Sequence, residues 1–202
     1  MRHVETIIVG GGPAGSTCAW QLNKHGHETL ILDKAVFPRP KLCAGWVTQK
    51  VLQDLQITQD DYPHPILKLD IRSHIKGLPF ALRGIPTPGD NYSIRRLEFD
   101  DWLLKRSGVE TVEHTIKTIR KEAGNYIIDE QYTCRNLVGA GGTACPVRRV
   151  MFPNNRRKFR QVVTLEREFE YPDRDDACHL YFMRYGAKAY AWYFPKADGF
   201  VN

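Results

Sequence analysis

The stretch Thr6-Ile7-Ile8-Val9-Gly10-Gly11-Gly12-Pro13-Ala14-Gly15 decides the fold of this chain. A β-branched run leads directly into the glycines, and a helix-compatible segment, residues 16–24, follows them. This strand–turn–helix order is the context in which a G-x-G-x-x-G pattern binds a dinucleotide. Gly10 allows the tight turn, Gly12 lets the backbone approach a pyrophosphate, and Gly15 lets helix and strand pack closely.

An acidic residue at the expected spacing strengthens this interpretation. Asp33 ends a second apolar run and lies 23 residues after Gly10 (33 − 10), close to the ~20 expected for an acid that hydrogen-bonds an adenosine ribose. A carboxylate there would repel a 2′-phosphate, which favours FAD or NAD over NADP. The pyrophosphate would lie on the first turn of the helix, at Pro13 and Ala14. The alternative is that Asp33 only ends its strand and caps a turn.

The composition is that of a globular protein. The 202 residues are 42 % hydrophobic and 26 % charged, enough for one large domain or one and a half. The longest apolar runs are only a few residues, so we expect neither a membrane span nor a signal peptide. The 5 cysteines are odd in number and contain no C-x-x-C pair. They indicate neither a metal site nor a disulfide framework and favour a reducing cytoplasm.

The net charge of +6 comes partly from Arg148-Arg149 and from the basic cluster at residues 156–160. A solvated basic face is one explanation. Attraction to an anionic cofactor, to a ferredoxin-like electron donor or to a phospholipid surface is the other. No recognition motif accompanies the charge, so we do not expect nucleic-acid binding.

Apolar periodicity and the positions of proline and glycine predict the remaining elements. A proline-rich loop covers residues 37–45. We expect helices at residues 47–55 and 97–105. Strands are expected at 109–113, 116–122, 126–130 and 135–140, with Gly124-Asn125 as a hairpin turn. Long aromatic-rich strands are expected at residues 159–171, 177–183 and 189–194.

Four segments together resemble the FAD-dependent geranylgeranyl reductase family, within the glutathione-reductase-like and aromatic-hydroxylase-like flavoproteins. The first is the glycine turn with Asp33, and the second is FPRPKLCAG at residues 37–45. The third, RLEFDDWL at residues 96–103, is similar to the family's R-x-x-F-D-x-W-L. The fourth, AYAWYFPK at residues 189–196, is similar to the signature Y-x-W-x-F-P-K and is the most specific. The resemblance covers nearly the whole chain.

The resemblance implies an α/β fold. A three-layer, Rossmann-like FAD-binding domain would comprise residues 1–60 and 91–152, interrupted by a β-rich insertion at residues 61–90. Residues 153–202 would begin a second, mainly β, substrate-binding domain.

The resemblance also implies cofactor contacts beyond the glycine turn. Lys34, Arg39 and Lys41 lie on the loop after Asp33, where the family brings a basic residue to the flavin; solvated loop charge is the alternative for Arg39 and Lys41. Arg96 opens a helix, where a cation opposes the helix dipole, so cofactor contact would compensate. An exposed surface cation is the alternative for Arg96.

A second glycine cluster, with Gly139 and Gly142, is similar to the family's G-A-D-G-x-x-S-x-V-R. It departs from that pattern, because Gly141 stands where the aspartate is usual and Cys145 where the serine is usual. The lost carboxylate puts direct reduction by NAD(P)H in doubt.

Aromatic residues of the last segment are the substrate-binding candidates. Tyr190, Trp192 and Phe194 alternate along a strand and so face one side. They either fill a core or wall an apolar cavity. In the resembled family such aromatic residues line a hydrophobic substrate cavity, and the Cys-x-Gly beginning at Cys43 approaches that cavity.

The resemblance implies an oxidoreductase in which reduced FAD gives a hydride to a carbon–carbon double bond of an apolar, isoprenoid substrate. NAD(P)H or a ferredoxin-type protein would supply the electrons, and basic patches would allow peripheral membrane contact. An FAD-dependent aromatic-ring monooxygenase is one alternative. The other is a truncated, catalytically incompetent nucleotide-binding fragment, because the only Gly-Asp pair, Gly89-Asp90, lies too early to complete an FAD site. No catalytic residue is identified.

Overall fold

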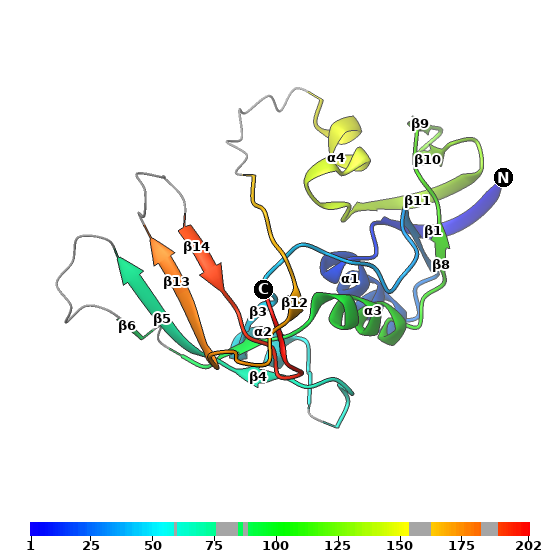
Figure 1. The fold of residues 1–202 in the computed structure, drawn as a ribbon. Coiled ribbons are helices and arrows are strands. Elements are labelled where there is room, and N and C mark those ends of the chain that lie inside the picture. The colour runs from blue at the N-terminus through cyan, green and yellow to red at the C-terminus, as the bar shows by residue number, and fades with distance from the viewer. Residues whose placement is uncertain (59, 76–84, 87–88, 154–162, 183–189) are drawn as a thin grey trace. The chain divides into compact units, whose positions relative to one another are not determined.

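The computed structural model describes residues 1–58, 60–75, 85–86, 89–153, 163–182 and 190–202. The chain forms two compact units (Figure 1). Unit 1 comprises Met1–Arg39 and Asp100–Val162, and unit 2 comprises Pro40–Phe99 and Val163–Asn202. Residues 40–60 and 91–99, which we predicted to share a domain with the glycine turn, therefore group with unit 2. The functional assignment of the predicted domains stays a prediction.

Unit 1 is built on one sheet with the strand order β8-β2-β1-β11-β10-β9. The first four strands are parallel: β8 (Thr111–Glu113), β2 (Thr29–Asp33), β1 (Arg2–Val9) and β11 (Tyr132–Gly139). Strands β10 (Asn125–Ile128) and β9 (Ile119–Glu122) extend the sheet as an antiparallel hairpin. The parallel part has the 3-2-1-4 order of a Rossmann fold, in which ligands bind where the strand order reverses.

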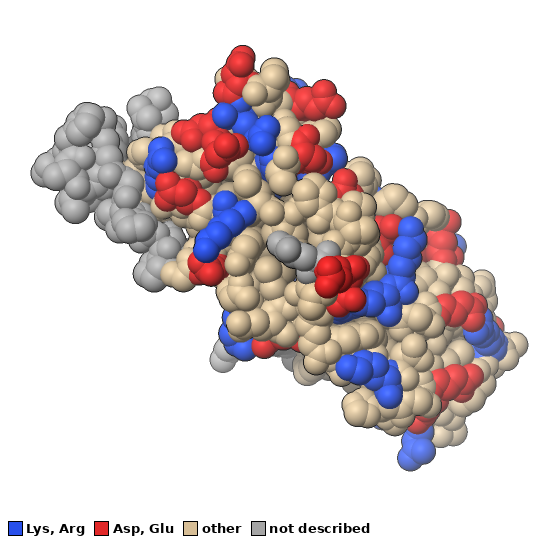
Figure 2. Space-filling view, turned by 90° about the horizontal axis from the view of Figure 1, so that it is seen from below, with Lys and Arg blue, Asp and Glu red and all other residues tan. Residues whose placement is uncertain are grey.

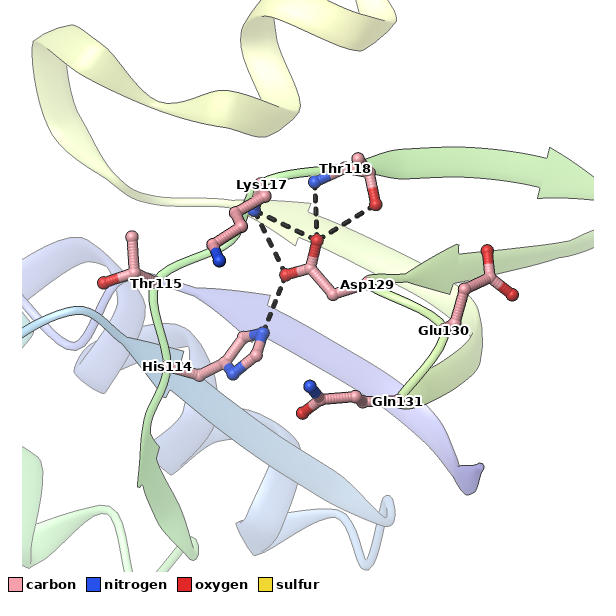
Figure 3. A pocket seen from close by; sticks show the side chains of 7 residues that line it. All are labelled: His114, Thr115, Lys117, Thr118, Asp129, Glu130 and Gln131. Carbon is pink, nitrogen blue, oxygen red and sulfur yellow. Dashed lines mark hydrogen bonds and ion pairs between the residues drawn. The ribbon is translucent and has the colours of Figure 1, made fainter.

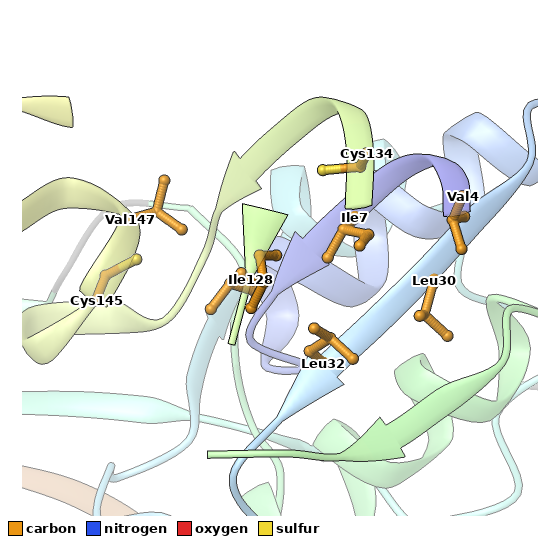
Figure 4. Close-up of a cluster of buried hydrophobic side chains, with 9 residues drawn as sticks. Val4, Ile7, Leu30, Leu32, Ile128, Cys134, Cys145 and Val147 are labelled. Carbon is orange, nitrogen blue, oxygen red and sulfur yellow. The ribbon is translucent and has the colours of Figure 1, made fainter. Parts of the chain in front are cut away.

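Alternate residues of β1 face different layers, as the period of two in a strand requires. Ile8 packs with Ala19 of α1 (Pro13–Lys24) and with Leu104 of α3 (Arg96–Arg106). Ile7 is fully buried in the cluster on the other face, which includes Cys145 and Val147 (Figure 4). Cys145 directly precedes α4 (Pro146–Met151), to which Val147 belongs. These layers confirm the predicted three-layer α/β fold.

The described residues of unit 2 form three small sheets. In the largest, β13 (Ala177–Phe182) pairs in parallel with β5 (Asp70–Ile75) and antiparallel with β14 (Tyr190–Tyr193). The chain positions predicted as an insertion and as the start of a second domain therefore share one sheet. The remaining elements are β6 (Ile85–Pro86) beside β5, the β3-β7-β4 sheet (Trp46–Thr48, Asn91–Ser93, Leu67–Lys68), the β12-β15 pair (Phe169–Glu170, Phe200–Val201) and α2 (Gln49–Asp54).

Three predicted elements differ from the structure. The helix predicted at residues 47–55 is preceded by β3, and only Gln49–Asp54 is helical, because Thr48 caps it by accepting the Val51 N–H at 3.4 Å. Of the long strand predicted at 159–171, the described part contains only Phe169–Glu170. Apolar alternation favours a strand, but it does not show whether a partner strand is present to pair with it, and among the described residues there only Phe169–Glu170 is paired, with β15.

The hairpin turn between β9 and β10 is the third difference. Asn125 pairs with Glu122, so the turn residues are Ala123 and Gly124 rather than Gly124 and Asn125. Both have positive φ, 47° and 85°, as a two-residue hairpin of the primed type needs. An alanine rarely adopts this conformation, so the sequence favoured the neighbouring pair. The predicted residues 154–162, 183 and 189 lie outside the described residues.

Candidate dinucleotide-binding site

The glycine turn connects β1 to α1 and lies at the carboxyl ends of the paired strands β1 and β11, the point where the strand order reverses. Gly10 has φ +107°, and a Cβ there would lie 2.6 Å from the carbonyl oxygen of Ala140. A Cβ on Gly15 would overlap the carbonyl oxygen of Gly10. Helix α1, the glycine turn and the end of β11 are thus packed so closely that only glycine fits at Gly10 and Gly15.

Gly12 differs from Gly10 and Gly15, because a Cβ built on it would point into open space. Among the described residues, the nearest atom to a Cβ built on Gly12 is Nη2 of Arg39, 3.6 Å away. Helix α1 begins directly afterwards with Pro13, no described side chain caps its N-terminus, and Ala14 is exposed. Uncapped N–H groups and the positive end of the helix dipole therefore meet at the open face of the turn, an arrangement that attracts an anion.

Asp33 supports the turn from behind. Its carboxylate is buried, and Oδ2 accepts the Gly11 N–H at 2.6 Å while Oδ1 accepts the Ala35 N–H at 2.9 Å. Asp33 therefore caps the turn, and its contact with a ribose stays a prediction. A carboxylate offers about four lone-pair sites, so these two bonds leave acceptor capacity for a ribose hydroxyl.

Arg39 brings a cation to the open face. Its guanidinium carbon lies 4.5 Å from the centre of the Phe37 ring, and Nη1 lies 3.9 Å from Oδ2 of the fully buried Asp100. A ring contact and a buried carboxylate thus orient the side chain toward Gly12, although the ion-pair distance is long. Lys34, the other basic candidate in unit 1, is exposed.

The second glycine cluster lies beside the first. Gly139 is paired with Val9 across the β1–β11 ladder, and the Ala140 N–H donates to the Val9 carbonyl at 2.8 Å. Gly142, with φ +70°, opens a short 3₁₀ helix (Gly142–Ala144). Cys145, at the position where the resembled pattern has a serine, is buried in the core cluster.

The other cofactor candidates belong to unit 2. Lys41 is exposed in the loop before β3, and Arg96 is the first residue of α3. Their contacts with a cofactor stay predictions, as do those of the glycine-turn residues.

The aromatic candidates of unit 2 range from buried to exposed. Phe194 is 2 % exposed and belongs to a cluster with Leu69, Ile71, Cys178 and Leu180, against which Trp192 packs. Tyr190, at the other end of the strand, is 52 % exposed. The structure therefore places Phe194 in a core and leaves Tyr190 accessible; Cys43 is half-buried.

Lys196 is a buried charged residue that the sequence did not single out. It ends the Y-x-W-x-F-P-K segment, yet its side chain is only 1 % exposed. Its ammonium donates to the carbonyl oxygens of Ala44 and Ile94 and to Oγ of Ser93. These partners are about 100 residues or more away along the chain, so only the motif itself could have drawn attention to the lysine.

A separate pocket in unit 1 lies at the loop between β8 and β9 (Figure 3). The carboxylate of Asp129 accepts the backbone N–H groups of Lys117 and Thr118 and contacts Nε2 of His114 at 2.8 Å. Burial tends to raise the pKa of Asp129, but these hydrogen bonds outweigh it and lower that pKa. The carboxylate is thus occupied in tying the loop to the β10–β11 turn.

The face drawn in Figure 2 mixes Lys and Arg with Asp and Glu. Arg148 and Arg149 are exposed at the end of α4, and the basic residues 156–160 lie outside the described residues. Within the described residues, no helix has the length and apolar character that crossing a bilayer requires.

Comparison with known proteins gives consistent similarities. Residues 8–59 match the family model of the NAD(P)-binding Rossmann-like domain. The chain is 26 % identical over 225 residues to digeranylgeranylglycerophospholipid reductase 3 of Methanosphaera stadtmanae, covering 100 % of this chain and 56 % of that protein. It is 28 % identical over 159 residues to geranylgeranyl diphosphate reductase of Rhodobacter capsulatus, covering 71 % and 39 %.

A solved structure shows the same fold. The geranylgeranyl bacteriochlorophyll reductase-like protein of Thermoplasma acidophilum matches with a TM-score of 0.68 and 21 % identity, over 100 % of this chain and 56 % of that one. The chain spans about half the length of the curated relatives it matches.

Proposed function

We propose, because the chain is related to the geranylgeranyl reductases, that this protein is an FAD-dependent oxidoreductase that reduces carbon–carbon double bonds of an apolar, isoprenoid substrate. One observation carries the proposal: the glycine turn presents an uncapped helix N-terminus and the Arg39 guanidinium at one open face. That face fits the pyrophosphate of a dinucleotide.

The residues of unit 1 fit FAD in three ways. The N–H groups at the start of α1 and the guanidinium of Arg39 would bind the pyrophosphate. The remaining lone pairs of Asp33 would accept from the adenosine ribose, and the backbone at Gly139 and Gly142 would line the adjoining side. When bound and reduced, FAD would supply the hydride that one carbon of the double bond receives, and the other carbon would take up a proton that comes from solvent.

Unit 2 would supply the substrate surface. Trp192 and Tyr190 would present aromatic surface next to the core that contains Phe194, and Cys43 directly precedes Ala44, which packs against that core. Aromatic walls of this kind suit an isoprenoid chain, since they offer apolar area without hydrogen-bonding groups.

The setting of the reaction is part of the proposal. The 5 cysteines are free, which suits the cytoplasm. Arg148 and Arg149 are exposed beside Phe152, which is 62 % exposed, and such a pairing suits contact with an anionic bilayer surface that holds an isoprenoid lipid. Gly141 offers no carboxylate toward a nicotinamide donor, so a ferredoxin-type reductant is expected to work at least as well as NAD(P)H.

The test is an anaerobic turnover experiment. The protein is loaded with FAD, reduced with dithionite and supplied with a digeranylgeranyl lipid, and the product is analysed by mass spectrometry. We expect a gain of two hydrogens for each double bond reduced. Oxygen-dependent gain of a hydroxyl group on an aromatic substrate would instead identify a monooxygenase, and a protein that takes up no flavin would overturn both assignments.

A further inference from the structure

Lys196 is a charged side chain enclosed in the interior of unit 2. It is 1 % exposed, and its Nζ donates to Oγ of Ser93 and to the carbonyl oxygen of Ile94, both at 2.9 Å, and to the carbonyl oxygen of Ala44. An ammonium carries three N–H donors, so each donor has one acceptor. Burying a charge is unfavourable unless it is fully hydrogen-bonded. The ammonium therefore remains in place only while all three acceptors are in position.

The three acceptors come from two separate segments. Ser93 ends β7 and Ile94 follows it, whereas Ala44 lies in the loop before β3. The Ile94 N–H also donates to the Gly45 carbonyl at 3.0 Å. Gly45 has φ +70°, and a Cβ there would overlap the Ile94 carbonyl oxygen and lie 2.9 Å from Nζ of Lys196. Glycine at this position is therefore what lets the lysine reach its acceptors.

The lysine also joins this loop to the aromatic candidates. Phe194 lies two residues before Lys196, and Ala44 packs against the apolar cluster that contains Phe194 and borders Trp192. A bond from Lys196 to the Ala44 carbonyl thus keeps the loop on the apolar cluster against which Trp192 also packs.

We infer that Lys196 is a positioning residue that holds segment 43–45, and with it the Cys43 thiol, against the aromatic surface of unit 2. The inference rests on the proposed function in one respect, namely that Cys43 and Trp192 contact the substrate. Lys196 does not act on the substrate itself, because its three donors are engaged by Ala44, Ser93 and Ile94.

Protonation tunes this hold. Burial lowers the pKa of Lys196 to about 8, while Glu168, Glu166, Cys43 and Asp198 act to raise it. An opening of the loop that brings the ammonium into water restores its ordinary pKa, so opening takes up a proton. Opening should therefore become rarer as the pH rises above neutrality.

The test measures the alkylation rate of Cys43 by iodoacetamide, with peptide mass spectrometry. At pH 7 we expect Lys196→Met to raise the Cys43 rate about tenfold, the effect of losing one or two hydrogen bonds that restrain the loop. Lys68→Met is the matched control, since Lys68 is an exposed lysine of the same unit that pairs with Asp90, and it should leave the rate unchanged. An unchanged Cys43 rate in Lys196→Met would overturn the inference.

The same experiment at pH 9.5 separates positioning from a general loss of structure. The ratio of the Cys43 rate in Lys196→Met to that in the wild type should rise severalfold between pH 7 and pH 9.5, because only the wild type loses a buried proton; a constant ratio contradicts the inference.

The alkylation rate of the buried Cys178 reports unfolding of unit 2. If Lys196→Met also exposes Cys178, the milder variant Ser93→Ala provides the test, because it removes only one acceptor of Lys196. Ser93→Ala should raise the alkylation rate of Cys43 severalfold while Cys178 stays protected, and an unchanged Cys43 rate would overturn the inference. No step uses FAD or substrate, so failure of the proposed function leaves the outcome readable.

Discussion

Raising the pH from 7 to 9.5 should stabilise unit 2 through Lys196, and Lys196→Met should remove that gain. The folded state lowers the pKa of this lysine from 10.5 to about 8. Between these values the unfolded chain binds more protons than the folded chain, so the free energy of unfolding rises with pH. The difference corresponds in full to about 3 kcal/mol, of which about 2 kcal/mol appears between pH 7 and pH 9.5.

Cys178 opposes this gain in the same pH range. Burial raises the pKa of its thiol from 9.0 to about 12, so the unfolded chain loses this proton first and stability falls by about 1 kcal/mol by pH 9.5. The wild type should therefore gain only about 1 kcal/mol over this range, and Lys196→Met should lose about as much. The change in the free energy of unfolding between pH 7 and pH 9.5 should therefore differ by about 2 kcal/mol between the wild type and Lys196→Met. Because Cys178 contributes equally to both proteins, this difference reports on Lys196 alone.

The absolute stability of Lys196→Met is less informative than its pH dependence. The substitution removes the cost of burying a charge, but it leaves the Ala44 and Ile94 carbonyls without their donor, at about 1–3 kcal/mol each. The two effects partly cancel. Urea unfolding followed by pulse proteolysis, with fragments of unit 2 identified by mass, gives the required values at both pH values. If this difference between wild type and variant is zero or has the opposite sign, the folded state does not lower the pKa of Lys196.

Four further substitutions test the turn and the core. Gly15→Ala should destabilise unit 1 by about 3 kcal/mol or more in thermal unfolding, because its Cβ overlaps the Gly10 carbonyl. Gly12→Ala should change stability by less than about 1 kcal/mol yet weaken binding of ADP measured by calorimetry, since its Cβ enters the open face. Asp33→Asn should cost about 1.5–3 kcal/mol in the same thermal unfolding, because a charge-assisted acceptor of two N–H groups is lost. Phe194→Ala should cost about 3–5 kcal/mol in urea unfolding of unit 2; a smaller loss would show that the ring lines a cavity instead of filling a core.

The first part of the fold could be predicted because its signals are local. The β-branched run, the three spaced glycines and Asp33 lie within one strand–turn–helix–strand unit, and each has a direct physical requirement. The period of two in a strand also predicts that neighbouring residues of β1 face different layers. Ile8 accordingly faces α1, and Ile7 faces the other layer.

What the sequence could not reveal depends on contacts between distant segments. Strand β5 pairs in parallel with β13, about 100 residues later, and no local pattern specifies that partner. Arg95 likewise forms ion pairs with Glu168 and Asp198, and Lys196 finds its acceptors on two other segments. Such polar groups look like ordinary surface charges until the tertiary structure buries them.

Binding of the adenine half of FAD is the property that the open face of the glycine turn should confer on the protein. Calorimetric titration of the protein with FAD and with ADP, repeated on Arg39→Met and on the control Lys24→Met, reports on the open face of the glycine turn, because Lys24 is exposed at the opposite end of α1. We predict that FAD binds, that ADP competes with it, and that Arg39→Met weakens both about tenfold or more through loss of a charge-assisted contact to phosphate, while Lys24→Met has little effect. FAD binding that ADP does not displace, or that Arg39→Met leaves intact, would show that the dinucleotide does not bind at the glycine turn.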